Sequence, residues 1–266
     1  MNNKKKIEEV LEGFGRQTPE PEKAFARQFL RHYPAIEDDE DSAEQRAGMT
    51  AGFFDFLRQR RPGEMLMRVY NPNGETSGWS STHTVVEMVN DDMPFLVDSV
   101  VLALSRLDIG VHLIIHPVVR LKRDQGGHFL EMAADDSDQS TAESLIHIRI
   151  DRQTSPDALA RIERRIRSAL ADVRLAVSDW KAMTRKALEI ADELAESKSG
   201  LDANELAEAR EFFKWLADDH FTLLGYREYL ITERDDGRVL EPVDKSGLGL
   251  MRDSHRKSPS RLLSDL

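Results

Sequence analysis

The sequence contains no cysteine among its 266 residues, which excludes disulfide bonds, thiolate metal sites and a cysteine nucleophile. It also contains no apolar run that approaches the roughly 18 residues of a membrane span. Near the start, Lys4-Lys5-Lys6 is followed by Ile7-Glu8-Glu9 rather than by the apolar core of a signal peptide. We therefore expect a cytoplasmic chain without disulfides.

Basic residues are outnumbered by acidic ones. The chain has 37 Lys and Arg against 48 Asp and Glu, a net charge of −11, which repels nucleic acid and anionic lipid. Four arginines do gather on one face of a predicted helix, but no aromatic residues alternate with them. We interpret that face as a solvated helix surface and expect no nucleic acid and no membrane as partners; its members are Arg161, Arg164, Arg165 and Arg167.

The fingerprint of a dinucleotide-binding site is also missing. No Gly-x-Gly-x-x-Gly occurs, and Gly247-Leu248-Gly249 lacks the third glycine. Ser99, which would be the nucleophile of a Ser-His-Asp hydrolase, has no nucleophile-elbow glycines beside it. The sequence therefore predicts a segment that binds no cofactor and is not catalytic.

Residues 1–78 are expected to form a helical leader. Apolar residues recur there at helical spacing, and prolines and the acidic run 37–41 separate the segments. We interpret Phe53, Phe54 and Phe56 as core side chains rather than as a hydrophobic ligand patch. A short strand is expected at 65–70, followed by a turn at Asn73-Gly74.

The middle of the chain predicts an α+β fold. Strands are expected at 84–90, 111–122 and 144–151, helices at 95–108 and 156–172, and a short final strand at 173–177. Ile146, Ile148 and Ile150 alternate with His147, Arg149 and Asp151, which is typical of a strand with one buried and one solvated face. We predict a two-layer βαββαβ sandwich with an antiparallel sheet and both helices on one face.

This order of elements resembles the ACT domain, which in many metabolic enzymes binds amino acids at the turn between its first strand and first helix. A common form of that turn is Asp-x-Pro-Gly-x-Leu, and residues 92–97 read Asp-Met-Pro-Phe-Leu-Val. Phe95 replaces the glycine that lets a ligand carboxylate approach the helix start, so the turn is expected to be filled and the sheet to serve packing and assembly. The candidate effector and interface residues are Asn90, Asp91, Asp92, Met93, Pro94, Phe95, Asp98, Gly110 and His112.

The polar residues around this turn have alternative interpretations. Asp91, Asp92 and Asp98 could bind magnesium, but carboxylates also favour a helix amino terminus, and we expect Asp91 and Asp92 to cap the helix that follows Pro94. His112, His116 and His147 could ligate zinc, but no carboxylate accompanies them by motif. We interpret them as ordinary sheet histidines and predict no metal site.

Three blocks, 89–99, 110–118 and 215–229, resemble in content and order the amino-terminal region of the large bacterial NAD-dependent glutamate dehydrogenases. The resemblance implies a parent enzyme that deaminates L-glutamate to 2-oxoglutarate and ammonia with NAD, and that has several ACT-like units. It also implies a homo-oligomer, contacts with the remaining domains of the parent chain, and an amino-acid effector. The chain itself would be a regulatory and assembly segment.

The expected domains are a helical leader at 1–78, an ACT-like domain at 79–178, a helical spacer at 179–219 and the start of a second ACT-like sheet at 220–266. Helices are expected at 180–195 and 203–217, and a hairpin with its turn at 235–237. We expect this second sheet to be cut short at Leu266. The alternative function is a free-standing sensor of amino acids or other small molecules, which would be expected to complete its second domain.

Overall fold

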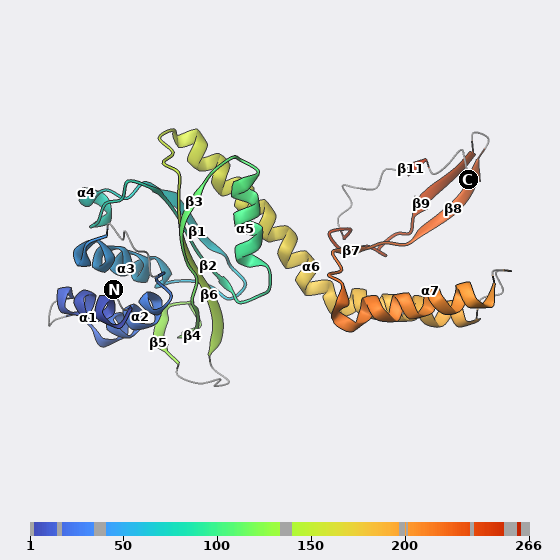
Figure 1. Cartoon of the computed structure of the whole chain (residues 1–266), viewed down its shortest axis with the longest axis horizontal. Helices are drawn as coiled ribbons and strands as arrows, with labels where there is room; N and C mark the ends of the chain where they lie inside the picture. The colour runs from blue at the N-terminus through green and yellow to red at the C-terminus, as the bar shows by residue number, and fades with distance from the viewer. Residues whose placement is uncertain are drawn as a thin grey trace. The chain divides into compact units, whose positions relative to one another are not determined.

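The computed structural model describes residues 3–14, 18–34, 41–133, 140–196, 200, 202–234, 237–252 and 260–261. The chain divides into two compact units, 1–169 and 170–266, which we describe separately (Figure 1). Within the part of the chain that the structure describes, no helix is both long enough and apolar enough to cross a membrane.

Three helices begin the first unit: α1 (Asn3–Gly13), α2 (Glu20–Arg31) and α3 (Ala43–Leu57). Ser42 starts α3 with a capping box, because its hydroxyl accepts a hydrogen bond from the Gln45 N–H while the Gln45 side chain accepts one from the Ser42 N–H. The rings of Phe25, Phe29 and Phe53 are fully buried, with centroids 5.2 to 6.2 Å apart. Of the predicted core residues, Phe53 and Phe54 are buried, and Phe56 is half-buried against the same core.

An antiparallel sheet follows, in the order β1-β2-β6-β4-β5, with β3 also paired to β6. His116 and Pro117 separate β3 from β4, and these two strands pair with successive stretches of β6. The short helix α4 (Gly74–Ser77) joins β1 to β2. The strands are β1 (Leu66–Tyr70), β2 (Thr84–Asp91), β3 (Val111–Ile115), β4 (Val118–Arg123), β5 (Phe129–Met132) and β6 (Thr141–Ile150). The predicted antiparallel sheet is confirmed.

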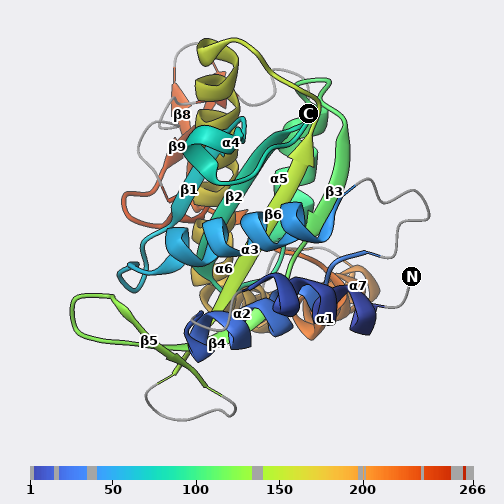
Figure 2. The ribbon, with the colours of Figure 1, turned by 90° about the vertical axis from the view of Figure 1, so that its left-hand side faces the viewer.

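Helices cover both faces of this sheet (Figures 1 and 2). As predicted, α5 (Leu96–Ser105) and the start of α6 (Pro156–Glu196) lie on one face of the sheet. Ile146, Ile148 and Ile150 of β6 are buried. The helices α1 to α3 lie on the other face, so the leader adds a third layer to the two that were predicted for the ACT-like domain. His147 is 0% exposed and Arg149 is 8% exposed, so these two members of the face predicted to be solvated are buried under the leader, whereas the Asp151 side chain is 48% exposed.

The predicted final strand at 173–177 was also wrong. Helix α6 continues through these residues without a break, so the helices expected at 156–172 and 180–195 are one helix of 41 residues. The sheet position beside β2 is instead taken by β1, which pairs with it antiparallel from Leu66 opposite Val89 to Tyr70 opposite Val85. The edge strand therefore comes from the segment before β2 and not from the segment after α6.

The second unit contains the rest of α6, α7 (Ala203–Trp215), the π-helical turn η1 (Leu216–His220) and short strands. The predicted hairpin is confirmed, because β8 and β9 pair antiparallel; the turn residues 235 and 236 lie outside the described residues. Asp179 accepts a hydrogen bond from the Gly249 N–H at 2.8 Å and pairs with Arg252. The strands are β7 (Gly225–Tyr226), β8 (Tyr229–Arg234), β9 (Gly237–Pro242), β10 (Leu248–Gly249) and β11 (Ser260–Arg261).

Candidate functional site around the turn before α5

The residues predicted for the effector turn fall into two groups at opposite ends of β6. The group from Asn90 to Asp98 lies near the start of β6, because Asn90 pairs with Ser144. Gly110 and His112 lie at its other end, where both bond to Asp151. Since a strand rises about 3.3 Å per residue, the seven residues from Ser144 to Asp151 put the groups roughly 23 Å apart. The structure therefore does not bring the predicted residues into one site.

Asp91 belongs to a cluster of charges that we call the ionic clamp, formed by Arg60, Asp91, Arg123 and Glu143. Asp91 lies directly opposite Glu143 in the sheet, and Arg60 pairs with both carboxylates, at 2.5 and 3.2 Å. Arg123 adds two hydrogen bonds to Glu143, at 2.7 and 2.9 Å. Two like charges in opposed strand positions would repel, and the two guanidinium groups offset that repulsion.

The clamp also holds the end of the leader. Arg123 donates to the carbonyl of Leu57, the last residue of α3, and Arg60 Nε donates to the carbonyl of Glu64. Arg60 is 1% exposed. A buried guanidinium needs its carboxylate partners, so the position of the segment after α3 is tied to the ends of β2 and β6.

Neither Asp91 nor Asp92 caps α5, so that prediction was wrong. Asp92 instead accepts a hydrogen bond from the Ser144 hydroxyl at 2.7 Å, and its N–H donates to the carbonyl of Ala142. The residue before α5 is Phe95, which makes no side-chain cap. Asp98 lies in the first turn of α5, where a carboxylate is favoured by the helix dipole.

Phe95 has an unusual backbone conformation for a large side chain. Its φ is 68° and its ψ is 8°, in the left-handed region that glycine adopts readily and other residues avoid. Phe95 is 48% exposed, so about half of it is accessible at the surface, and a turn filled by its ring stays a prediction. The chain thus keeps the geometry of a glycine turn without the glycine and places the aromatic ring at the surface.

The structure adds His116 to the turn, a residue that sequence analysis had assigned to a different group. His116 Nε2 lies 3.2 Å from the Ser144 hydroxyl, which in turn donates to Asp92. Burial lowers the pKa of His116, and the Asp92 carboxylate opposes that shift only in part. The break between β3 and β4 positions this imidazole, and a His-Pro pair within a predicted strand is the signal that could have indicated such a break.

At the other end of β6, Asp151 organises a second polar group. It accepts hydrogen bonds from the Gly110 N–H at 2.6 Å and from His112 Nε2 at 2.7 Å. The Gly110 N–H and then the His112 side chain lower the pKa of Asp151. The ring of His83 lies 4.4 Å from that of His112. A side chain at position 110 would meet the Asp151 carboxylate, which explains the glycine there.

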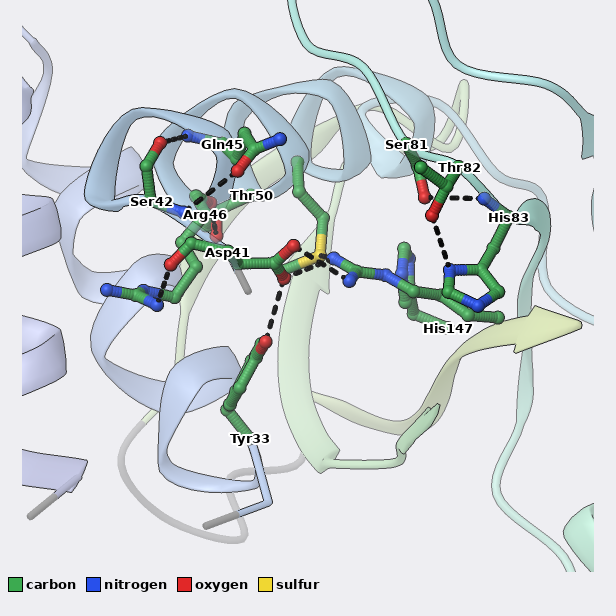
Figure 3. A network of polar contacts seen from close by, with 12 residues as sticks. Tyr33, Asp41, Ser42, Gln45, Arg46, Thr50, Ser81, Thr82, His83 and His147 are labelled. Atoms are coloured by element: carbon green, nitrogen blue, oxygen red, sulfur yellow. Dashed lines mark hydrogen bonds and ion pairs between the residues drawn. The ribbon is translucent and has the colours of Figure 1, made fainter. Parts of the chain in front are cut away.

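Asp41, between α2 and α3, links the leader to the sheet (Figure 3). Its carboxylate accepts from the Tyr33 hydroxyl at 2.7 Å and from both terminal nitrogens of Arg149, at 2.9 and 2.5 Å. Arg46 of α3 donates to the Asp41 carbonyl. Because the Arg149 side chain is nearly buried, it depends on this carboxylate from the leader for its charge partner.

Glu87 and His147 form a second buried pair, on neighbouring strands. His147 Nδ1 lies 2.9 Å from Glu87, and both side chains are 0% exposed. Arg68 donates to the same carboxylate at 2.6 Å. Nε2 of His147 has no hydrogen-bond partner among the described residues, and the rings of Phe29, Phe53 and Trp79 surround it. Burial lowers the pKa of His147, which favours the neutral imidazole.

Each of these polar groups bonds to neighbouring side chains or backbone within the fold. His112, His116 and His147 bond to three different partners, and no group of three or more His, Asp or Glu side chains in the described ranges could hold a metal ion. Ser99 lies within α5. The arrangement can position α5, the leader and the strand ends relative to one another.

Comparison with known proteins places this fold in a family. The family described as "Glutamate dehydrogenase, ACT1 domain" matches residues 25–166, more than half of the chain. The chain therefore belongs to the glutamate dehydrogenase ACT1 domain family, and its predicted relation to the amino-terminal region of the large NAD-specific glutamate dehydrogenases is confirmed.

The similar proteins are named NAD-specific glutamate dehydrogenases. The chain is 37% identical to that of Halomonas elongata over 91% of its own length, and 35% identical to that of Pseudomonas aeruginosa over 86%. The protein of Mycobacterium tuberculosis is 26% identical over 91% of the chain. In each case the chain spans only 14 to 15% of the relative's length.

The buried charges were not predicted from the sequence, above all Arg60, Glu87 and Glu143. One signal was present in β2, where Val85, Val86, Met88 and Val89 are apolar on both faces, as in a strand covered on both sides. A leader rich in phenylalanine also needs an apolar partner, and the second sheet face provides it.

Proposed function

We propose that the chain is a non-catalytic regulatory and assembly segment of a large NAD-dependent glutamate dehydrogenase. Support comes from its family membership and from the named activity of its relatives, whose length it covers only in small part. NAD and glutamate would bind elsewhere in such an enzyme. The segment would contact the remaining domains and help to form a homo-oligomer.

The role in assembly is supported by the side chains of the turn before α5, which are bonded within the fold or exposed at the surface. The carboxylates of Asp91 and Asp92 are already bonded to Arg60 and Ser144, so they are not poised to bind the ammonium group of an amino acid. Phe95 stands in the motif position where glycine admits a ligand carboxylate, and its ring is exposed. A strained, exposed aromatic residue is better suited to contact another protein surface than to enclose a small ligand.

The proposal implies that amino acids bind the chain weakly, with dissociation constants no better than about millimolar, or roughly −4 kcal/mol. Isothermal titration calorimetry of the purified chain with glutamate and a panel of other amino acids tests this. The control variant Asp92→Asn keeps the size of the side chain and removes its charge. A micromolar site that this variant abolishes would show that the turn is a working effector site, contrary to the proposal.

A further inference from the structure

Three aromatic rings are stacked on the surface of the second unit. Phe212 and Trp215 have ring centroids 6.1 Å apart and planes 17° apart, and His220 lies on Trp215 at 5.2 Å and 21°. Phe212 is 54% exposed, Trp215 is 46% exposed and the His220 side chain is 49% exposed. We call these three residues the aromatic platform. So much exposed ring surface in one place is typical of a binding surface.

The local fold builds this platform from outward-facing positions. Phe212 and Trp215 are three residues apart on α7 and so share one face of the helix, whereas Leu206 and Phe213 face the other way and are half-buried. At η1, Asp219 adopts a left-handed conformation with φ 54°, and the chain reverses so that His220 reaches the Trp215 ring. The platform thus lies outside the packing that the second unit makes within itself.

The charges around the platform are mainly negative. Asp218 and Asp219 precede His220; the Asp218 carboxylate lies 3.7 Å from His220 Nδ1, and its side chain is 85% exposed. Glu208 and Glu211 lie on the exposed side of α7, and Lys214, which pairs with Glu211 at 2.8 Å, is the one cation among these exposed groups. Ring faces carry negative partial charge, so rings and carboxylates here favour the same ligand, a cation. The same charges disfavour a second copy of this platform as its partner.

We propose that the aromatic platform binds arginine side chains of a partner protein. A guanidinium group is planar, stacks on ring faces and is weakly hydrated, and its fork of N–H donors matches a carboxylate. A lysine ammonium would be attracted by the same charges but would gain less from stacking. This partner surface goes beyond the proposed function and does not depend on the turn before α5.

Two peptides of equal charge test the proposal: a fluorescently labelled tetra-arginine amide and the matching tetra-lysine amide, titrated into the full chain by fluorescence anisotropy. We expect the arginine peptide to bind about three- to tenfold more tightly, because cation–π stacking adds to the shared charge attraction. Trp215→Ala should remove this preference, whereas Trp215→Phe, which retains a ring, should keep most of it. Tyr229→Ala, which removes an exposed ring outside the platform, should leave it unchanged.

Removing the two charges beside the platform with Asp218→Asn and Asp219→Asn should weaken the binding of both peptides by the same factor. Asparagine also tolerates the left-handed conformation of residue 219. Circular dichroism establishes that each variant keeps its helical content. Equal affinities of the two peptides, or an arginine preference that survives Trp215→Ala, would overturn the proposal. So would analytical ultracentrifugation showing that the chain self-associates and that Trp215→Ala abolishes the association, because a second copy would then cover the platform.

Discussion

Because Phe95 has a left-handed backbone conformation, we predict that glycine at position 95 gives a more stable protein than alanine does, the reverse of the usual order. Phe95→Gly and Phe95→Ala both remove the ring, so the lost side-chain contacts cancel in the comparison. What remains is the backbone term at φ 68° and ψ 8°. This conformation destabilises the alanine variant by about 1–2 kcal/mol, whereas glycine adopts it without steric cost.

Glycine has a different disadvantage: it makes the unfolded chain more flexible, which lowers the free energy of unfolding by roughly 0.5–1 kcal/mol. The difference leaves Phe95→Gly more stable than Phe95→Ala by about 0.5–1 kcal/mol. Leu102 is a control, since it is 53% exposed and lies within α5, the helix that Phe95 precedes. There the ordinary order applies, and Leu102→Ala should be more stable than Leu102→Gly by about 1 kcal/mol.

Urea denaturation followed by circular dichroism gives the free energy of unfolding of all four variants under the same conditions. The result that supports the reasoning is a change of sign between the two positions. If alanine were at least as stable as glycine at position 95, the left-handed conformation would be wrong, and with it the strained, exposed placement of the ring.

Two further predictions concern the charges beneath the leader. Arg60→Met leaves the buried Glu143 with Arg123 as its remaining charge partner, and it should lower the free energy of unfolding in urea by about 3–5 kcal/mol. Arg58→Met, which removes an exposed ion pair with Asp55, should lower it by less than about 1 kcal/mol. Equal losses for the two variants would contradict the ionic clamp. His147 has a folded-state pKa below its ordinary value of 6.5, so the unfolded chain binds more protons and the free energy of unfolding should fall as the pH drops below about 6.5. His147→Gln should make that decline shallower, and an unchanged slope would show that His147 does not titrate on unfolding.

The sequence was sufficient where periodicity and chain order decide the structure. The strands around Val86 and Ile148, the helix after Pro94 and the antiparallel sheet were predicted because alternation along a strand and apolar stripes along a helix are local patterns. The third layer was not predicted, because His147 and Arg149 look like solvent-facing residues until their partners in the leader are known. Asp41, the charge partner of Arg149, lies 108 residues before it in the chain.

The candidate site shows the same limit. The turn was located correctly from its Asp and Pro, but the residues that bond to it, Arg60, Ser144 and His116, come from three other segments. Gly110 and His112 were grouped with the turn by resemblance, although the register of β6 places them at the far end of the sheet. Contacts between distant segments decide which residues meet, and local patterns in one sequence do not show those contacts.

The measurement that tests the central claim most directly is glutamate-dependent reduction of NAD by the purified 266-residue chain, followed by the absorbance of NADH. The sequence has no Gly-x-Gly-x-x-Gly dinucleotide fingerprint, and the carboxylates of Asp91 and Asp92 are bonded to Arg60 and Ser144. We expect no rate above that of the buffer. Turnover that coelutes with the chain in chromatography and rises in proportion to its concentration would contradict a non-catalytic segment.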